Sequence, residues 1–509
     1  MRTKIIKTPI SHSASSPSDC DQLNHDSQFY LSSILAPYPE KTTRFSRNPQ
    51  KHCAHTNTMF FQNLARQNDI GANCYLLETS DSNIVLDSGM HPKEEGIDAL
   101  PAHHELPPHS VDAIVLSHAH LDHAGTIPVL MRDQQDAPLY LTQPTADLAK
   151  ALLHNSVNVM QHKRLELGIT EYPLYGHREL DRLATRWEPK SYLTPWKINR
   201  DTKLTFHDAG HILGSAGVMV ESDNKRIFYT GDIQFEDQTL ITGARFPEEH
   251  VDTLIVETTR GASPRRPDYD RDEEEQRLLK AILDTLERGG SALIPVFAMG
   301  KTQEVLTMIH KFKTAGLLPE KTPVYMGGLS TKMTLLFDDL SDSTSRKVPD
   351  FKILEDMDIN TGSKKHKGAP ITYRPGSIFC LSSGMMSENT TSNIFAQTFI
   401  SNPKNSLLFV GYADPETPGG IIRQTRRGDI VKLSKDQPPV VLDCPVEIFD
   451  FSGHATRDAI LDYILKIKPN QVFLVHGDSP ALEWFQQQIS QKLPQTECVI
   501  PTPGKKYTL

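Results

Sequence analysis

Residues 114–130 read Ile-Val-Leu-Ser-His-Ala-His-Leu-Asp-His-Ala-Gly-Thr-Ile-Pro-Val-Leu. The apolar run from Ile114 to Leu116 predicts a buried strand, and the periodic apolar residues after Ala124 predict the start of a helix. Metal-type side chains fill the turn between these elements: His118, His120, Asp122 and His123. Imidazoles and a carboxylate together suit a divalent metal such as zinc. A histidine-rich surface turn is the alternative, but a turn needs Gly, Asn or Pro for its geometry and gains nothing from imidazoles.

The composition is that of an ordinary globular protein. With 509 residues, 38% of them hydrophobic and 23% charged, the chain exceeds what one core usually supports, so two domains or one domain with a large insertion are expected. No apolar run approaches the roughly 18 to 20 residues that span a bilayer, and no apolar segment follows the charged first residues. Neither a membrane span nor a signal peptide is therefore expected. Six cysteines without Cys-x-x-Cys spacing predict reduced thiols in a cytoplasmic protein.

The formal net charge is −9, which argues against a protein that coats nucleic acids nonspecifically. The charge does not exclude a nuclease, because metal ions and a local basic groove can hold phosphates on an acidic protein.

The first 58 residues differ in character from the rest. Residues 1–58 are rich in Ser, Asp, Asn, His and Pro and show no sustained period, which predicts a disordered extension. Met59 is followed at once by patterned sequence, so a start of translation at Met59 is the alternative.

Acidic residues end two further predicted strands. Asp87 lies at the end of the strand predicted within residues 82–89, where it could orient a metal-bound histidine, although Asp-Ser-Gly is also an ordinary turn. Asp232 follows a glycine at the end of the strand predicted within residues 226–233. Successive strand ends that carry metal-type residues suggest one shared sheet edge, which is where α/β folds usually keep their chemistry.

His211 is a further candidate ligand. It lies between Gly210 and Gly214, whose small size lets the backbone come close to a bound group. His207 is the competing candidate, but it sits at a strand end without the glycines, so we expect it outside the ligand set.

In this order the motifs resemble the metallo-β-lactamase superfamily. The family signature is an early strand-end Asp, then His-x-His-x-Asp-His, a lone His and a strand-end Asp. The matching residues are Asp87, His118, His120, Asp122, His123, His211 and Asp232.

The chain then continues past the usual end of that fold. A strand predicted at residues 253–257 ends in Glu257, and an amphipathic helix is predicted at residues 271–288. Strands and helices alternate as far as residue 443, which predicts a separate α/β unit. Gly300-Lys-Thr imitates the end of a nucleotide-binding loop, but Pro295 stands where that loop has its first glycine, so a nucleotide triphosphatase is rejected.

The last part of the chain extends the resemblance to the β-CASP nucleases. Their motif A resembles Glu257 in Glu-Thr-Thr-Arg-Gly, motif B resembles His454 in Phe-Ser-Gly-His, and motif C resembles His476 in Leu-Val-His-Gly. Local text such as Pro295-Val-Phe-Ala-Met-Gly-Lys-Thr-Gln-Glu is similar to the branch that contains the endonuclease of pre-mRNA 3′-end cleavage and its prokaryotic relatives. The match covers about residues 69–480. Arg260 departs from the pattern, because those relatives usually have Tyr there.

The resemblance implies an α/β fold in which a metallo-β-lactamase αββα sandwich, residues 59–261 and 444–509, is interrupted by a β-CASP domain, residues 262–443. It implies two zinc ions. His118, His120 and His211 would hold one ion, Asp122, His123 and His476 would hold the other, and Asp232 would bridge them. His454, steadied by Glu257, would donate a proton to the leaving oxygen. Asp122 and Asp87 complete the residues expected to take part in catalysis.

The expected function is zinc-dependent cleavage of single-stranded RNA in RNA processing or decay, because RNA-cutting members of the family carry His at motif C. A DNA exonuclease of the related bacterial repair branch would have the same metal ligands, so this alternative stays open. DNA as a binding partner and a homodimer also stay open. No membrane partner is expected. A catalytically inactive scaffold would typically have lost ligands, and a β-lactamase or thioester hydrolase would leave the insertion unexplained. Endonuclease and exonuclease modes both stay open.

Overall fold

A computed structural model describes residues 58–344, 346–362 and 371–509. The extension predicted at residues 1–58 lies, apart from Thr58, outside the described residues. Within the described part, every helix is too short or too polar to cross a membrane.

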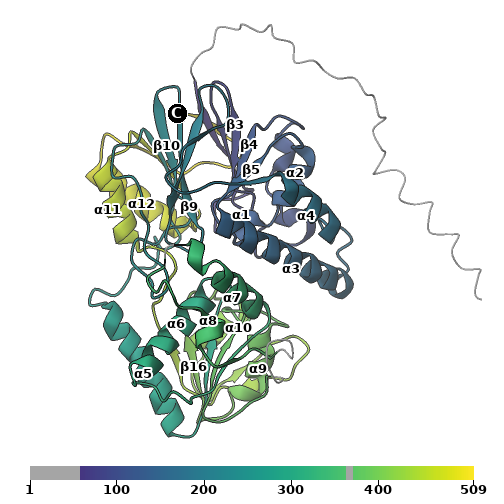
Figure 1. The fold of residues 1–509 in the computed structure, drawn as a ribbon, viewed down its shortest axis with the longest axis vertical. Coiled ribbons are helices and arrows are strands. Elements are labelled where there is room, and N and C mark those ends of the chain that lie inside the picture. The colour runs from purple at the N-terminus through teal and green to yellow at the C-terminus, as the bar shows by residue number, and fades with distance from the viewer. Residues whose placement is uncertain (1–57, 345, 363–370) are drawn as a thin grey trace, which may run out of the picture. The chain divides into compact units, whose positions relative to one another are not determined.

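Two seven-stranded sheets stack on each other in the upper part of the molecule as drawn in Figure 1. In order across the first sheet, the strands are β22 (Lys506–Thr508), β1 (Phe60–Asn63), β2 (Tyr75–Glu78), β3 (Asn83–Leu86), β4 (Ala113–Val115), β5 (Leu139–Leu141) and β6 (Trp187–Pro189). In order across the second, they are β21 (Glu497–Val499), β20 (Gln471–Val475), β11 (Thr253–Glu257), β10 (Lys225–Tyr229), β9 (Ala216–Ser222), β8 (Lys203–Asp208) and β7 (Trp196–Lys197). Apolar side chains from both sheets, such as Phe61 and Phe206, form one core between them.

Helices cover the outer face of each sheet. The first sheet is flanked by α1 (Leu121–Ala124), α2 (Ile127–Asp133), α3 (Gln143–Leu167) and α4 (His177–Leu183), and the second by α11 (Arg457–Ile467) and α12 (Ser479–Lys492). Strand β11 shows why its sequence is a continuous apolar run: Ile255 faces the core between the sheets, while Leu254 and Val256 pack under α11 and α12. The predicted αββα sandwich is confirmed.

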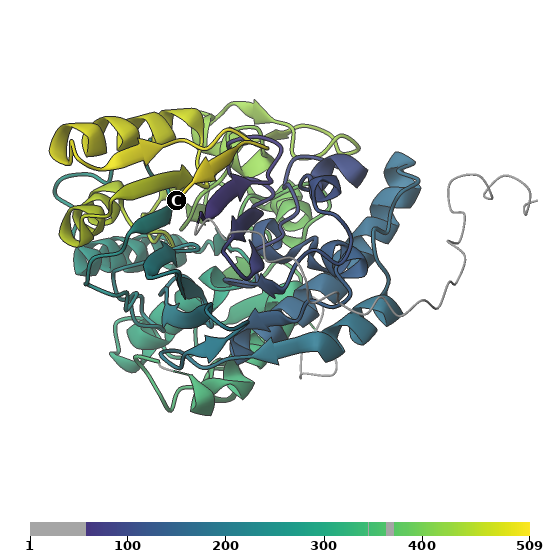
Figure 2. The same cartoon turned by 90° about the horizontal axis from the view of Figure 1, so that it is seen from above.

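The C-terminal segment completes both sheets. Strand β20 pairs in parallel with β11, and β22 pairs antiparallel with β1, with Thr508 opposite Phe60. Figure 2 shows this yellow segment beside the purple and teal strands. Strand β20 therefore carries its end to the same sheet edge as β11, which is what brings His476 to residues far earlier in the chain.

The lower part of the molecule in Figure 1 contains a six-stranded parallel sheet. In order, its strands are β14 (Ile359–Asn360), β13 (Val324–Gly327), β15 (Ile378–Leu381), β12 (Ala292–Pro295), β16 (Ser406–Phe409) and β19 (Val446–Ile448). Its helices are α5 (Arg271–Glu287), α6 (Lys301–Thr314), α7 (Leu329–Asp339), α8 (Ile353–Asp356), α9 (Thr391–Phe399) and α10 (Pro418–Gln424). Strands β17 (Ile430–Val431) and β18 (Val440–Val441) form a separate two-stranded sheet in this part of the molecule.

Two details differ from the sequence prediction. Strand β19 pairs in parallel with β16, so the sheet of the insertion runs to Ile448, beyond the boundary predicted at residue 443. The polar composition of residues 168–200 predicts a connection without regular structure, but these residues contain α4 and the edge strands β6 and β7. These elements are short and partly exposed, so their sequences carry little periodicity.

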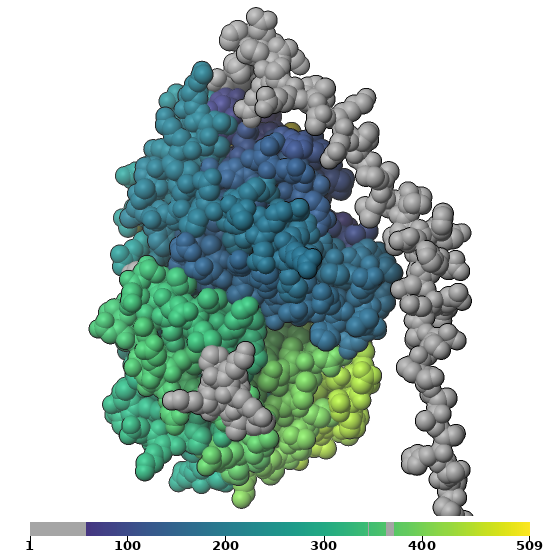
Figure 3. Space-filling view, turned by 45° about the vertical axis from the view of Figure 1, so that its right-hand side comes forward, coloured from purple at the N-terminus to yellow at the C-terminus, as the bar shows by residue number. Residues whose placement is uncertain are grey.

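Glu304 of α6 connects the insertion to the sandwich. The two parts lie against each other in Figure 3. Its buried carboxylate accepts hydrogen bonds from the backbone N–H groups of Thr239 (2.9 Å) and Leu240 (3.2 Å). It also forms an ion pair with Arg271 of α5 at 2.5 Å. One side chain thus satisfies donors from both halves.

Glu304→Ala is therefore expected to lower the free energy of unfolding by about 3 kcal/mol, because it removes the charge partner of Arg271 and the acceptor of two backbone N–H groups, one of them buried. Urea unfolding measures this value. Glu320→Ala, at an exposed glutamate after the same helix, is the control and should change stability by less than about 0.5 kcal/mol. Equal effects of the two substitutions would contradict the anchoring role.

Candidate metal centre

The His-rich turn leaves β4 and enters α1 at the edge where the parallel strands β3 and β4 end. Asp87, just after β3, holds this turn. Its carboxylate accepts hydrogen bonds from the N–H of Ser117 (2.7 Å), from Nδ1 of His123 (2.7 Å) and from the hydroxyl of Tyr229 (2.6 Å). With Nδ1 bound to Asp87, Nε2 of His123 is directed into the site.

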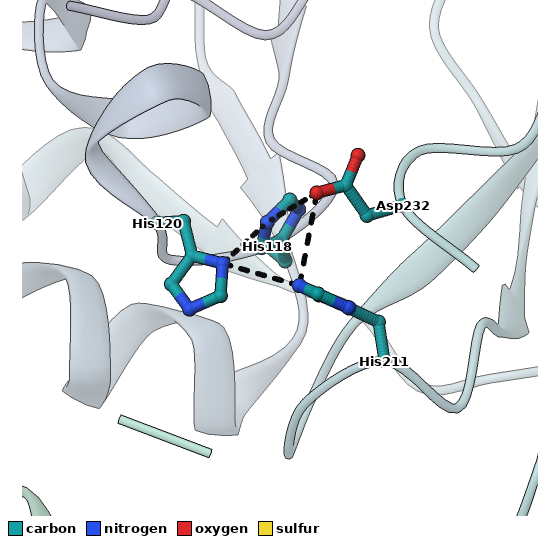
Figure 4. Close-up of side chains that lie close together, drawn as sticks. All are labelled: His118, His120, His211 and Asp232. Carbon is teal, nitrogen blue, oxygen red and sulfur yellow. Dashed lines mark hydrogen bonds and ion pairs between the residues drawn. The ribbon is translucent and has the colours of Figure 1, made fainter. Parts of the chain in front are cut away.

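A first group of side chains converges on one point from the His-rich turn, the loop after β8 and the end of β10 (Figure 4). Its members are His118, His120, His211 and Asp232, and their ligand atoms all lie within 4.8 Å of one another. Nδ1 of His120 lies 3.1 Å from Nε2 of His118 and 3.1 Å from Nε2 of His211.

A second group lies on the other side of Asp232. Its members are Asp122, His123 and His476, again with ligand atoms within 4.8 Å of one another. Nε2 of His476 lies 3.3 Å from Oδ2 of Asp122. Asp232 faces both groups, because its Oδ2 lies 3.5 Å from Nε2 of His118 while its Oδ1 lies 3.3 Å from Nε2 of His123.

The chemistry of these groups fits a divalent metal. Burial lowers the pKa of His118 well below its usual range, and the same effect, reinforced by His454, lowers the pKa of His211, so both rings are neutral and have a free lone pair. Burial disfavours ionised Asp232, yet His476 and His123 hold the pKa of its carboxyl well below its usual range. Oδ1 of Asp232 is buried and has no hydrogen-bond partner among the described residues. Two neutral imidazoles beside a carboxylate with one unsatisfied oxygen are suited to hold a divalent metal ion.

A titratable pair adjoins the first group. Glu257, buried at the end of β11, lies 3.2 Å from Nδ1 of His454 through each of its carboxylate oxygens. Glu257 is fixed by the N–H of Ile233, the residue after Asp232, at 2.6 Å. The ring of His454 lies 4.6 Å from the ring of His211, centroid to centroid, and its side chain is 24% exposed. Burial opposes protonation of His454, but Glu257 raises its pKa above its usual value.

The structure thus brings together every residue that the sequence singled out as a candidate, except the competitor His207. His207 packs its ring edge-on against Phe228, with centroids 5.7 Å apart, and belongs to neither ligand group.

Three residues beside the site were not predicted. The hydroxyl of Thr259 lies 2.9 Å from Nδ1 of His476, and Nδ2 of Asn73 lies 3.2 Å from Nε2 of His123. Gln238 donates to the carbonyl oxygen of His211 at 2.9 Å. Thr259 could have been suspected from its place two residues after Glu257, but Asn73 and Gln238 act through contacts that leave no local pattern.

Comparison with family profiles agrees with this geometry. The profile of the metallo-beta-lactamase superfamily matches residues 68–290, that of the Beta-Casp domain matches residues 302–422, and that of the Zn-dependent metallo-hydrolase RNA specificity domain matches residues 439–501.

Individual relatives match most of the chain. Transcription termination factor FttA of Methanosarcina mazei is 30% identical over 447 residues, which are 84% of this chain and 68% of that protein. FttA of Methanocaldococcus jannaschii is 28% identical, with 81% of this chain and 65% of that protein covered. Endoribonuclease YSH1 of Eremothecium gossypii is 28% identical, with 83% and 55% covered. The chain therefore spans about two thirds or less of the length of these relatives.

A solved structure shares the fold. A protein of unknown function from Enterococcus faecalis V583 superposes with a TM-score of 0.54 at 13% identity, covering 89% of this chain and 100% of the other. With the three profile matches and the Methanosarcina relative, the chain belongs to the β-CASP family of metallo-β-lactamase-fold proteins.

Proposed function

We propose that this protein is a zinc-dependent phosphodiesterase that cleaves single-stranded RNA. The observation that carries the proposal is the pair of ligand groups joined by Asp232, with the Glu257–His454 pair beside them. Two adjoining metal sites next to a titratable acid are typical of active sites that hydrolyse phosphodiesters.

Each of the two groups is proposed to hold one zinc ion. The first ion would be held by His118, His120 and His211, the second by Asp122, His123 and His476, and Asp232 would contact both. When bound, zinc supplies a Lewis acid that activates water near neutral pH and offsets negative charge on phosphate oxygens. Asp87 fixes the tautomer of His123, because it accepts the proton on Nδ1 and leaves Nε2 as the ligand atom.

His454 is proposed to donate the proton that the leaving oxygen needs. Glu257 accepts from Nδ1 and stabilises the protonated ring, so Nε2 is the nitrogen that can face a substrate. The partial exposure of the ring keeps that nitrogen within reach. After the transfer, the neutral ring regains its proton from water.

RNA is the proposed substrate class for two reasons. The curated relatives are named an endoribonuclease and a transcription termination factor, and the C-terminal profile is that of an RNA specificity domain. His476 also occupies motif C, as in the RNA-cutting branch that the sequence resembles. An inactive scaffold is disfavoured because every ligand position is filled. A homodimer and a cytoplasmic location stay predictions from the sequence.

The proposal predicts that zinc-loaded protein cleaves end-labelled single-stranded RNA faster than DNA of the same sequence. Removal of metal with a chelator should abolish cleavage, zinc should restore it, and elemental analysis should find about two zinc ions per chain. Equal or faster cleavage of DNA would move the protein to the repair branch. No cleavage of either strand by zinc-loaded protein would favour the scaffold.

A further inference from the structure

Lys301 is a buried lysine that the proposed mechanism does not use. It begins α6 of the insertion, directly after the glycine of the Gly-Lys-Thr text, and is only 8% exposed. Burial lowers its pKa to about 8. Because a buried ammonium group is costly unless it is hydrogen-bonded, the partner of Nζ indicates what the residue is for.

The partner of Lys301 Nζ is the backbone carbonyl oxygen of Phe451. Phe451 begins the loop of residues 451–454, which contains motif B and ends in His454. Among the hydrogen bonds of the described residues, no other donor reaches this carbonyl. A side chain of the insertion thus holds the start of this loop.

The loop of residues 451–454 contacts the metal centre in two places. The carbonyl oxygen of Gly453 accepts a hydrogen bond from Nδ1 of His211 at 2.7 Å, which directs Nε2 of His211 toward the first ligand group. His454 faces Glu257 at 3.2 Å. A shift of the loop would therefore move one proposed ligand and the proposed proton donor together.

Other anchors fix different points of the same segment. Gln234 donates to the carbonyl oxygens of Ser452 (3.0 Å) and His454 (3.2 Å). The preceding Asp450 is held by Arg260 at 2.7 Å and by Arg265 at 3.3 Å. The bond from Lys301 lies between these two sets, so its loss leaves the carbonyl oxygen of Phe451 without a hydrogen-bond donor among the described residues.

We propose that Lys301 is a positioning residue through which the insertion sets the loop of residues 451–454, and with it the imidazoles of His211 and His454. The inference rests on the proposed function for its kinetic readout, but zinc affinity reports it independently. Carbonyl groups that orient a ligating histidine typically govern metal affinity by 10- to 100-fold, and small misplacements at a site can cost about 100-fold in rate.

The test compares Lys301→Met, which keeps the apolar stem and removes the donor, with Lys301→Arg, which keeps the charge and the donor. Lys313→Met is the matched control, since Lys313 of the same helix also donates from Nζ to a backbone carbonyl, that of Thr322 at 2.7 Å, away from the site. Zinc affinity by chelator competition and single-turnover RNA cleavage are measured on all three.

Lys301→Met should bind zinc about 10-fold more weakly and cleave about 10- to 100-fold more slowly, with little change in KM. Lys301→Arg should recover most of both losses, and Lys313→Met should match the wild type in both. Equal zinc affinity and rate in Lys301→Met and Lys313→Met would overturn the inference and leave the proposed function standing. If wild-type protein cleaves no nucleic acid, the function fails while the zinc comparison still decides the inference. Should Lys301→Met not fold, Lys301→Leu, which is smaller and also has no donor, takes its place with the same expected losses. Wild-type zinc affinity and rate in Lys301→Leu would overturn the inference.

Discussion

His476→Ala is expected to lose bound zinc and RNA cleavage together. His476 contributes to the second ligand group, where its Nε2 lies 3.3 Å from Asp122, and its Nδ1 lies 3.2 Å from Oδ1 of Asp232. Alteration of a residue that merely orients a ligand costs 10- to 100-fold in metal affinity, so removal of a ligand should weaken zinc binding by more than about 100-fold.

Elemental analysis after dialysis should find the wild type with about two zinc ions per chain and His476→Ala with about one. Single-turnover cleavage of RNA should fall with the missing ion. His207→Ala is the matched control, because His207 also lies near a strand end but belongs to neither ligand group. It should keep its zinc and its rate. Full zinc content in His476→Ala, or loss of zinc in His207→Ala, would show that the ligand groups are assigned wrongly.

The fold was predictable where its signals are local. Helix α3, Gln143–Leu167, is an example, because its apolar positions recur at helical spacing over many turns and Gly168 ends it in a left-handed conformation. The apolar runs of β11 and β20 were equally clear, since both strands are buried on both faces.

The parts that escaped prediction depend on partners far away in the chain. Strand β22 is three residues long and partly exposed, and it exists because β1, more than 400 residues earlier, offers an unpaired edge. Strand β19 likewise forms on the edge of β16. Short edge strands such as these take their conformation from the sheet that they extend, so their own residues reveal little.

The candidate site divides in the same way. The metal-type residues could be listed from the sequence because each lies in a compact motif or at a strand end, and the shared sheet edge follows from parallel pairing of β11 with β20. The supporting contacts could not. Lys301 lies in a short sequence that resembles part of a nucleotide-binding loop, and its partner Phe451 lies 150 residues further along the chain. Such a contact is set by the packing of two domains and leaves no trace in either local sequence.

His454→Ala is expected to keep its zinc and still lose RNA cleavage by about 10²- to 10⁴-fold, the usual contribution of a general acid. His454 belongs to neither of the two groups proposed to hold zinc, and its Nδ1 is occupied by Glu257 at 3.2 Å. Its ring is near the first group, with its centroid 4.6 Å from that of His211, so a proton on Nε2 is close to where a leaving oxygen would be.

A substrate that needs no general acid separates this role from a structural one. When sulfur replaces the leaving oxygen of the RNA, the leaving group departs as a thiolate. Because the pKa of a thiol is near 8.5, the thiolate leaves without prior protonation. This substrate should restore most of the rate of His454→Ala but not that of His476→Ala, in which the metal site itself is damaged. If His454 only packs in the loop, its removal should lower thermal stability, and the rate per folded molecule should be near wild type with both substrates. If it instead holds metal, His454→Ala should lose zinc as His476→Ala does, and the sulfur substrate should bring no recovery. Only proton donation combines full zinc content, slow cleavage of ordinary RNA and rescue by a better leaving group.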